Sequence, residues 1–574
     1  MDNFNDINLI NNPLRFFEAI KNIKEKEKKY QVLIEISKKH NIDICLYAVK
    51  AIEGGFDAFL MNMLIVEVIG DIKLNKESLY VYLSLLSCSV QDPFFSYPQY
   101  RQIQIIASKQ EDFAYEFLEY LQAIDEPLAF QYIKELILCI NKINNEEKHS
   151  DFLLMVESGN EIKIICGLNG LGRLNYSPDD DIELINETLK LFDTMLIKNV
   201  QSINIELSRA LGNMFSLGDE IINRIVSLSE NKDPFILLEI SEFLFRYRKV
   251  VKDKLYFNKL LLSLTNIKCE YLRENNNIDM LLSSILEEDD NIYVVLDFIL
   301  KWISNGNCSI SSILDLQLLD MTLCIIYSKN TIFQKALLAL FNNDNIIAPQ
   351  LATCIITKNY SRNDRINFDL DIITDLSNDD IIFIFSKILS CNFLPEILCS
   401  LICSLLLGKK HNTIIVDFLS DCFAEYIGFN YPETTIKALN EMLDILEDDE
   451  NIASKINNIL IKINEIKKTR YNNCKLKELV PSRKDCYLLY KEEWSQSQRT
   501  IEKAEGSSKL IKLLSKSHVK YGKSTSHYYN ENISESEPFK CISYSFELAY
   551  NSCIDPVYHC INLNHFQNMK KGEI

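Results

Sequence analysis

The sequence predicts an all-α protein, a right-handed helical-repeat solenoid followed by a small α+β appendage at its C-terminal end. From Pro13 to about Lys468, segments with apolar residues three and four positions apart follow one another, and this is the period of an amphipathic helix. The 574 residues include only 15 Gly and 12 Pro, fewer than the many turns of an all-β protein require. After residue 470 both the charge and the apolar pattern change, which predicts the appendage.

Individual helices are marked by their apolar faces and by their first residues. In the segment 111–124, Phe113, Phe117, Leu118 and Leu121 fall on one helical face, and we expect Phe117 in the core. Proline follows an acidic residue at 126–127 and again at 233–234, where its missing N–H is harmless at the start of a helix.

The longest apolar run, ILCSLICSLLL at 397–407, is about half as long as a membrane-spanning helix, so we expect a buried core helix there. The N-terminal residues show no basic segment followed by an apolar stretch, so no signal peptide is expected. The 17 cysteines follow no disulfide-like spacing, which favours a reducing compartment. We therefore expect a cytoplasmic protein without a membrane partner.

A weak internal repeat favours stacked units. ILEEDDNIYVVLDFIL (285–300) is similar to ILEDDENIASKINNIL (445–460), an acidic turn followed by an apolar helix. This pattern resembles degenerate HEAT and armadillo α-solenoids, whose two-helix units span roughly 35–47 residues. The resemblance implies that residues 1–470 form an array in which each unit buries its apolar face against its neighbours. A large irregular helical bundle is the alternative.

Residues 471–574 form the predicted C-terminal domain, which is rich in basic residues, His, Cys and Tyr. Residues 462–523 hold 16 Lys and Arg against 7 Asp and Glu, and segment 539–548 (FKCISYSFEL) alternates like a strand. Cations interleaved with aromatic residues could contact nucleic acid. The candidate contacts are Lys467, Lys468, Arg470, Lys475, Lys477, Arg483 and Lys484.

Four residues near the end of the chain are of types that bind zinc: Cys553, His559, Cys560 and His565. Their spacing matches no standard zinc finger, so a structural metal, a catalytic histidine and ordinary surface residues all remain open. We expect no cofactor.

The segment GLNGLGR (167–173) comes near a dinucleotide-binding fingerprint, but Asn175 stands where its last glycine belongs. A loop between two helices is the interpretation we favour for it.

Three functions follow from these patterns. The first is a non-enzymatic scaffold that binds another protein along an extended helical surface, with a net charge of −19 favouring a basic partner. The second is a nucleic-acid-associated subunit that contacts phosphate through the basic C-terminal segment. The heavy use of Ile, Asn, Lys and Tyr is typical of AT-rich bacterial genomic islands, which suggests a defence or virulence system, such as antiviral defence, for this subunit. The third is an enzyme with its site in the C-terminal His/Cys cluster.

Overall fold

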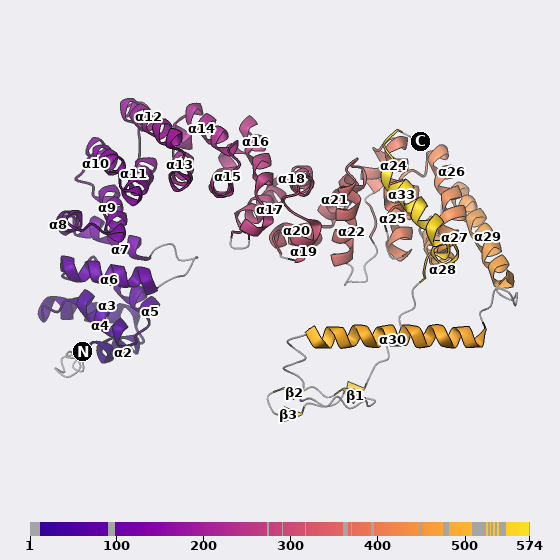
Figure 1. Ribbon diagram of the computed structural model, residues 1–574, viewed down its shortest axis with the longest axis horizontal. Helices are drawn as coiled ribbons and strands as arrows, with labels where there is room; N and C mark the ends of the chain where they lie inside the picture. The colour runs from indigo at the N-terminus through magenta and orange to yellow at the C-terminus, as the bar shows by residue number, and fades with distance from the viewer. Residues whose placement is uncertain are drawn as a thin grey trace. The chain divides into compact units, whose positions relative to one another are not determined.

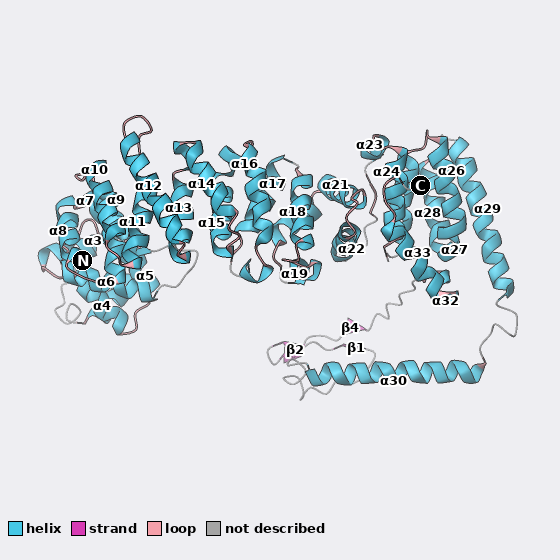
Figure 2. Cartoon of the chain, turned by 45° about the horizontal axis from the view of Figure 1, so that its top comes forward, coloured by secondary structure: helices cyan, strands magenta, loops and turns pink. Residues whose placement is uncertain are grey.

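Helices make up most of the structure, as the apolar pattern predicts (Figure 1, Figure 2). The computed structural model describes residues 12–89, 98–272, 275–289, 291–315, 317–359, 366–368, 370–391, 395–446, 450–473, 482–507, 524–525, 528–529, 532–533, 537–538 and 547–572. Within these ranges, every helix is too short or too polar to span a lipid bilayer.

The chain forms two compact units. The first consists of Met1–Ile285 and Lys301–Thr322, and the second of Leu286–Leu300 and Leu323–Ile574. The division between them passes through α17 (Asn277–Asp289), α18 (Ile292–Ser304) and α20 (Asp320–Ser328).

The remaining helices of the first unit are α2 (Pro13–Lys21), α3 (Lys26–Lys39), α4 (Ile44–Glu53), α5 (Ala58–Ile65), α6 (Lys76–Ser89), α7 (Pro98–Lys109), α8 (Glu111–Gln122), α9 (Pro127–Cys139), α10 (Asn145–Glu157), α11 (Glu161–Arg173), α12 (Ile182–Lys198), α13 (Gln201–Asn213), α14 (Asp219–Ser229), α15 (Pro234–Val251), α16 (Leu255–Ser263) and α19 (Ile310–Asp315), with 3₁₀ turns at Phe215–Leu217, Leu264–Asn266 and Cys269–Leu272.

Two rows of helices run through this unit. In one row α7 packs on α9, α9 on α11, α11 on α13, and α13 on α15 (Figure 1). The helices between them, α8, α10, α12 and α14, each pack against members of that row and form the second row. Each helix therefore buries its apolar face against helices that are close in the sequence.

The sequence marks the helix starts and the core of this unit correctly. Pro127 and Pro234 occupy the first turns of α9 and α15. The Asp233 carboxylate accepts a hydrogen bond of 2.9 Å from the backbone N–H of Phe235, which satisfies one of the free donors of the helix end. Phe117 is fully buried and Phe113 stacks on it, as expected from their common face.

The expectation of a loop at 167–173 is wrong, because these residues lie inside α11. The glycines allow close packing instead of a turn. A Cβ on Gly170 would lie 2.3 Å from the ring of Phe152 on α10, and a Cβ on Gly172 would lie 2.5 Å from Ala210 Cα on α13. Since no larger residue fits at these two contacts, the glycines bring α10 and α13 close to α11.

The second unit contains α21 (Asn330–Phe341), α22 (Ile347–Asn359), α23 (Leu370–Thr374), α24 (Asn378–Leu389), α25 (Pro395–Gly408), α26 (Thr413–Cys422), a π-helical turn (Phe423–Ile427), α27 (Gly428–Asn430), α28 (Pro432–Ile445), α29 (Glu450–Asn473), α30 (Arg483–Ser507), α32 (Tyr550–Ile554) and α33 (Pro556–Asn568). The apolar run at 397–407 forms most of α25, and nearly all of its side chains are buried, so the predicted core helix is confirmed.

The end of the chain returns to the second unit. The Glu547 carboxylate accepts hydrogen bonds of 3.0 and 2.9 Å from the backbone N–H groups of Glu433 and Thr434, in the first turn of α28. Lys387 of α24 donates to the carbonyl oxygens of Gln567 and Met569, at 2.6 and 2.9 Å. The position near residue 470 at which the sequence changes lies inside α29, and residues on both sides of it belong to this unit.

Strand structure in the described residues is limited to two short antiparallel pairs. β1 (Ser524–Thr525) pairs with β4 (Glu537–Pro538), and β2 (Tyr528–Tyr529) pairs with β3 (Asn532–Ile533). The strand expected at 539–548 falls almost entirely outside the described residues. A folded α+β appendage therefore stays a prediction.

Candidate functional site

The first unit carries a long groove with a volume of about 1020 Å³. It crosses six helices, α5, α7, α9, α11, α13 and α15, and the last five of these form the first of the two rows described above. The residues that line it are Phe59, Asn62, Met63, Val66, Tyr100, Arg101, Gln104, Gln131, Lys134, Glu135, Ile165, Cys166, Asn169, Arg173, Glu206, Arg209, Asn213, Glu242 and Arg246.

Helical spacing places these side chains in the groove. Each helix contributes residues three, four or seven positions apart, which share one face. On α11 these residues include Cys166, Asn169 and Arg173, and on α15 they are Glu242 and Arg246. The opposite faces of the same helices hold the apolar core.

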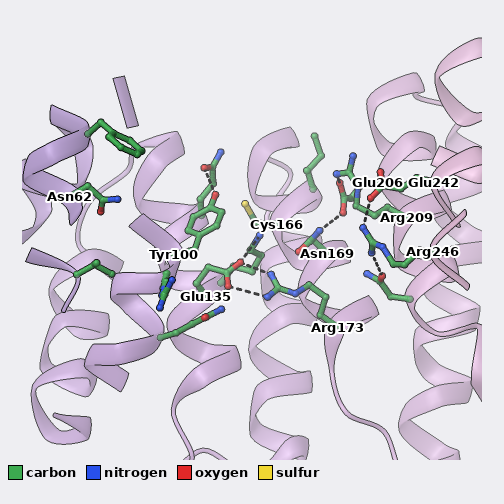
Figure 3. Close-up of a pocket in the computed structure, with 18 of the residues that line it drawn as sticks. Asn62, Tyr100, Glu135, Cys166, Asn169, Arg173, Glu206, Arg209, Glu242 and Arg246 are labelled. Carbon is green, nitrogen blue, oxygen red and sulfur yellow. Dashed lines mark hydrogen bonds and ion pairs between the residues drawn. The ribbon is translucent and has the colours of Figure 1, made fainter. Parts of the chain in front are cut away.

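Ion pairs join one helix of the row to the next, as Figure 3 shows. The Arg173 guanidinium donates two hydrogen bonds to the Glu135 carboxylate, of 2.5 and 3.1 Å, from α11 to α9. Lys134 Nζ lies 3.2 Å from the same carboxylate and 5.5 Å from the centre of the Tyr100 ring. A planar guanidinium that pairs twice with a carboxylate fixes the geometry of both side chains.

A second cluster continues the network toward α15. The Glu206 carboxylate accepts hydrogen bonds of 2.6 Å from Asn169 Nδ2 and 2.7 Å from Arg209 Nη1. Arg209 also donates two hydrogen bonds to Glu239, of 3.0 and 2.6 Å. Arg246 pairs with Glu242 on its own helix. The carboxamide oxygen of Asn169 is buried without a hydrogen-bond partner.

Two of the carboxylates that line the groove, those of Glu135 and Glu206, are buried, whereas the guanidinium groups that pair with them are more exposed. The side chain of Glu135 is 1% exposed and that of its partner Arg173 is 36% exposed. The same order holds for Glu206 at 5% and Arg209 at 42%. The accessible surface of the groove is therefore more basic than a count of its charged residues implies.

Burial and charge set the ionisation of these groups. Burial lowers the pKa of Arg209, but Glu206 and Glu239 more than offset this effect, so its pKa lies above the ordinary value. Burial also raises the pKa of Glu239, an effect that the hydrogen bond from Arg209 partly offsets. Burial raises the pKa of the Cys166 thiol to about 11, so this thiol is neutral at pH 7 and is a poor nucleophile.

The candidate zinc ligands lie on the last two helices. Cys553 belongs to α32, whereas His559, Cys560 and His565 belong to α33. In the part of the chain that the structure describes, no three His, Cys, Asp or Glu side chains come together in an arrangement that could hold a metal ion. Nδ1 of His559 is buried without a hydrogen-bond partner.

The candidate nucleic-acid contacts fall into three groups. Lys468, Arg483 and Lys484 are exposed, on α29 and at the start of α30. Lys475 and Lys477 lie outside the described residues. Lys467 forms an ion pair of 2.5 Å with Glu433 on α28.

Arg470 has a structural role in the second unit. Its guanidinium lies 4.2 Å from the centre of the Phe429 ring and 3.6 Å from that of Tyr550, and it donates to the Phe429 carbonyl oxygen. Burial lowers the pKa of Arg470. Contact of residues 462–523 with nucleic acid stays a prediction, but Lys467 and Arg470 are already engaged within the protein.

The sequence contains a signal for the groove that periodicity within single helices does not reveal. Arg173, Arg209 and Arg246 recur at intervals of 36 and 37 residues, which is about the length of a two-helix repeat. A search for charges repeated at that interval would have found the groove.

The chain matches no known family model, no curated protein and no solved structure.

Proposed function

We propose that the protein is a non-enzymatic scaffold that holds a segment of a partner protein in the groove of its first unit. The observation that supports this most directly is that one continuous groove crosses six helices, every second helix from α5 to α15. A compact substrate needs a closed pocket, whereas a groove of this length matches an extended polypeptide.

The stacking of the helices supports the wider proposal of a right-handed solenoid similar to HEAT and armadillo arrays. In the first unit each helix of the row from α7 to α15 packs on the next member of the row, which is the contact pattern of repeats that touch only their neighbours. Such arrays present extended surfaces, and partner binding is their usual role.

The chemistry of the groove supports binding over catalysis. Its carboxylates are paired with guanidinium groups, and its one thiol is neutral because of its raised pKa. Groups held in ion pairs of this kind recognise charged ligands and position them.

A cytoplasmic location is part of the proposal. None of the 15 cysteines that the structure describes is part of a disulfide bond, and 5 of them are buried. Cysteines of this kind are typical of proteins from a reducing compartment.

The test is affinity purification from the native host, followed by mass spectrometry, with wild type and two matched variants. Glu135→Gln/Arg173→Gln neutralises an ion pair between helices inside the groove. Asp193→Asn/Arg224→Gln does the same to a bidentate pair between α12 and α14, at 2.8 Å, outside the groove. We expect a partner in equal yield with wild type and the control, and in much lower yield with the groove variant. Equal recovery with all three proteins would contradict binding in the groove.

A further inference from the structure

The groove of the first unit differs in charge from the chain that carries it. Five basic side chains line it, namely Arg101, Lys134, Arg173, Arg209 and Arg246, against the three acidic side chains of Glu135, Glu206 and Glu242. The whole chain has a net charge of −19. We infer that the groove binds an acidic, extended segment of the partner protein, an inference that rests on the proposed function and specifies its ligand.

The difference in exposure between the acidic and the basic side chains supports an acidic ligand. Glu135 and Glu206 are almost fully buried beneath Arg173 and Arg209, so an incoming chain meets guanidinium groups first. Arg246 at one end of the groove is 51% exposed. The attraction between these cations and a ligand carboxylate is strengthened by the partly desolvated groove.

The guanidinium groups also have donors left for a ligand. A guanidinium carries five N–H donors. Arg173 donates two hydrogen bonds to Glu135, and Arg209 donates one to Glu206 and two to Glu239. The remaining N–H groups can bind carboxylate oxygens without breaking the pairs that hold the helices together.

A polypeptide fits the groove better than a nucleic acid does. Carboxamides line the groove between the cations, and such groups both donate to and accept from peptide groups. Only two aromatic residues, Phe59 and Tyr100, line it, whereas sites for single-stranded nucleic acid combine a basic groove with aromatic rings on which successive bases stack. A long polyanion would also have to pass over the acidic remainder of the surface.

The spacing of the cations predicts the spacing of the carboxylates. Packed helices lie about 8–10 Å apart, and an extended peptide advances about 3.3 Å per residue. The helices α11, α13 and α15 each contribute one arginine. These arginines should therefore pair with acidic side chains at roughly every third residue of the ligand.

The test is fluorescence anisotropy with four labelled probes and the full-length protein. The first probe is a 15-residue peptide with Glu at every third position and Ser or Ala elsewhere. The second has the same composition with its Glu residues gathered at one end, the third has Lys in place of Glu, and the fourth is a (dT)15 oligonucleotide.

The test variant is Arg101→Gln/Arg246→Gln, which removes two exposed cations and leaves no buried carboxylate unpaired. The control is Lys39→Gln/Lys259→Gln, which removes the same charge from exposed ion pairs with Glu35 and Glu230 in the same unit. Exposed pairs of this kind contribute little to stability, so both variants should fold, and circular dichroism checks that they do.

We expect the spaced Glu peptide to bind most tightly, and its Kd to rise about tenfold in the test variant, which corresponds to ~1.4 kcal/mol, with no change in the control. Tighter binding of the Lys peptide or of (dT)15, or equal affinity of both variants for the spaced Glu peptide, would overturn the inference. The two proposals can fail separately. A groove-dependent partner whose bound segment is neutral or basic would overturn the acidic ligand and leave the scaffold intact. Binding of the Glu peptide without any groove-dependent partner would overturn the scaffold.

Discussion

Gly172 lies at a close contact between α11 and α13, and replacing it with alanine tests whether this contact is rigid. A Cβ at this position would lie 2.5 Å from Ala210 Cα and 2.6 Å from Ala210 Cβ. Both atoms are fixed to the backbone of α13, so they can move away only if that helix moves. We therefore expect Gly172→Ala to destabilise the first unit.

Two opposing effects set the size of this change. Alanine is favoured over glycine inside a helix by about 1 kcal/mol. Overpacking a well-filled contact costs about 1–3 kcal/mol, and the upper end applies here because carbon atoms prefer a separation of about 3.5–4.0 Å. The net loss in the free energy of unfolding should be ~1–2 kcal/mol.

Gly212 on α13 provides a matched control. A Cβ there would have its nearest neighbour at 3.4 Å, an ordinary contact with the ring of Phe243. Only the helix-propensity effect then remains, so Gly212→Ala should stabilise the unit by ~0.5–1 kcal/mol. The same substitution on two adjacent helices should thus change stability in opposite directions.

The assay is urea unfolding followed by tryptophan emission and by far-ultraviolet circular dichroism. The chain has two tryptophans. Trp302 is buried in the first unit and donates a hydrogen bond of 2.7 Å to the Ile267 carbonyl, whereas Trp494 on α30 is exposed. In a Trp494→Phe background the emission comes from Trp302 alone. A stabilising effect of Gly172→Ala, or the same sign for both glycines, would refute the close-packing argument.

Three further changes probe other parts of the chain. Phe117→Asp places a charge in the core and should cost ~3–5 kcal/mol, so an unchanged melting temperature would contradict the burial of this ring. His149 is buried 3.8 Å from Glu187, and burial lowers its pKa. The unfolded chain then takes up the proton first, so stability should fall as the pH drops below about 6.5 toward the lowered pKa, and His149→Gln should remove this slope; an identical slope in both proteins would count against it. Arg470→Gln removes a cation from the ring of Tyr550 and should speed hydrogen exchange in residues 547–572 roughly tenfold, whereas unchanged protection would show that other contacts suffice.

Local features of the fold could be predicted from the sequence because they depend on neighbouring residues. The proline at the start of α9, the buried run in α25 and the apolar face around Phe117 each follow from the residues of a single helix. The glycines of α11 could not be interpreted in this way. They allow close contact with Phe152 and Ala210 on other helices, whereas within their own helix they only lower the helix propensity of the segment.

The candidate site depends on relations between helices, which explains why the apolar period within single helices does not reveal it. Glu135 and Arg173 look like solvated charges on two separate helices, and only the stacking of α9 on α11 brings them together. The return of the C-terminal residues was equally hidden, since the hydrogen bonds from Lys387 reach residues 180 and 182 positions away. No short-range period encodes such a contact.

The anchoring of residues 547–572 on the second unit has a topological consequence for residues 474–546. Both ends of this segment are held by the same group of helices. Its first residue follows α29 directly, and the residues after it are held to α28 by Glu547 and to Arg470 of α29 by Tyr550. A single peptide-bond cut within it would leave two fragments that stay associated, visible as two bands on a denaturing gel and one species on a native gel.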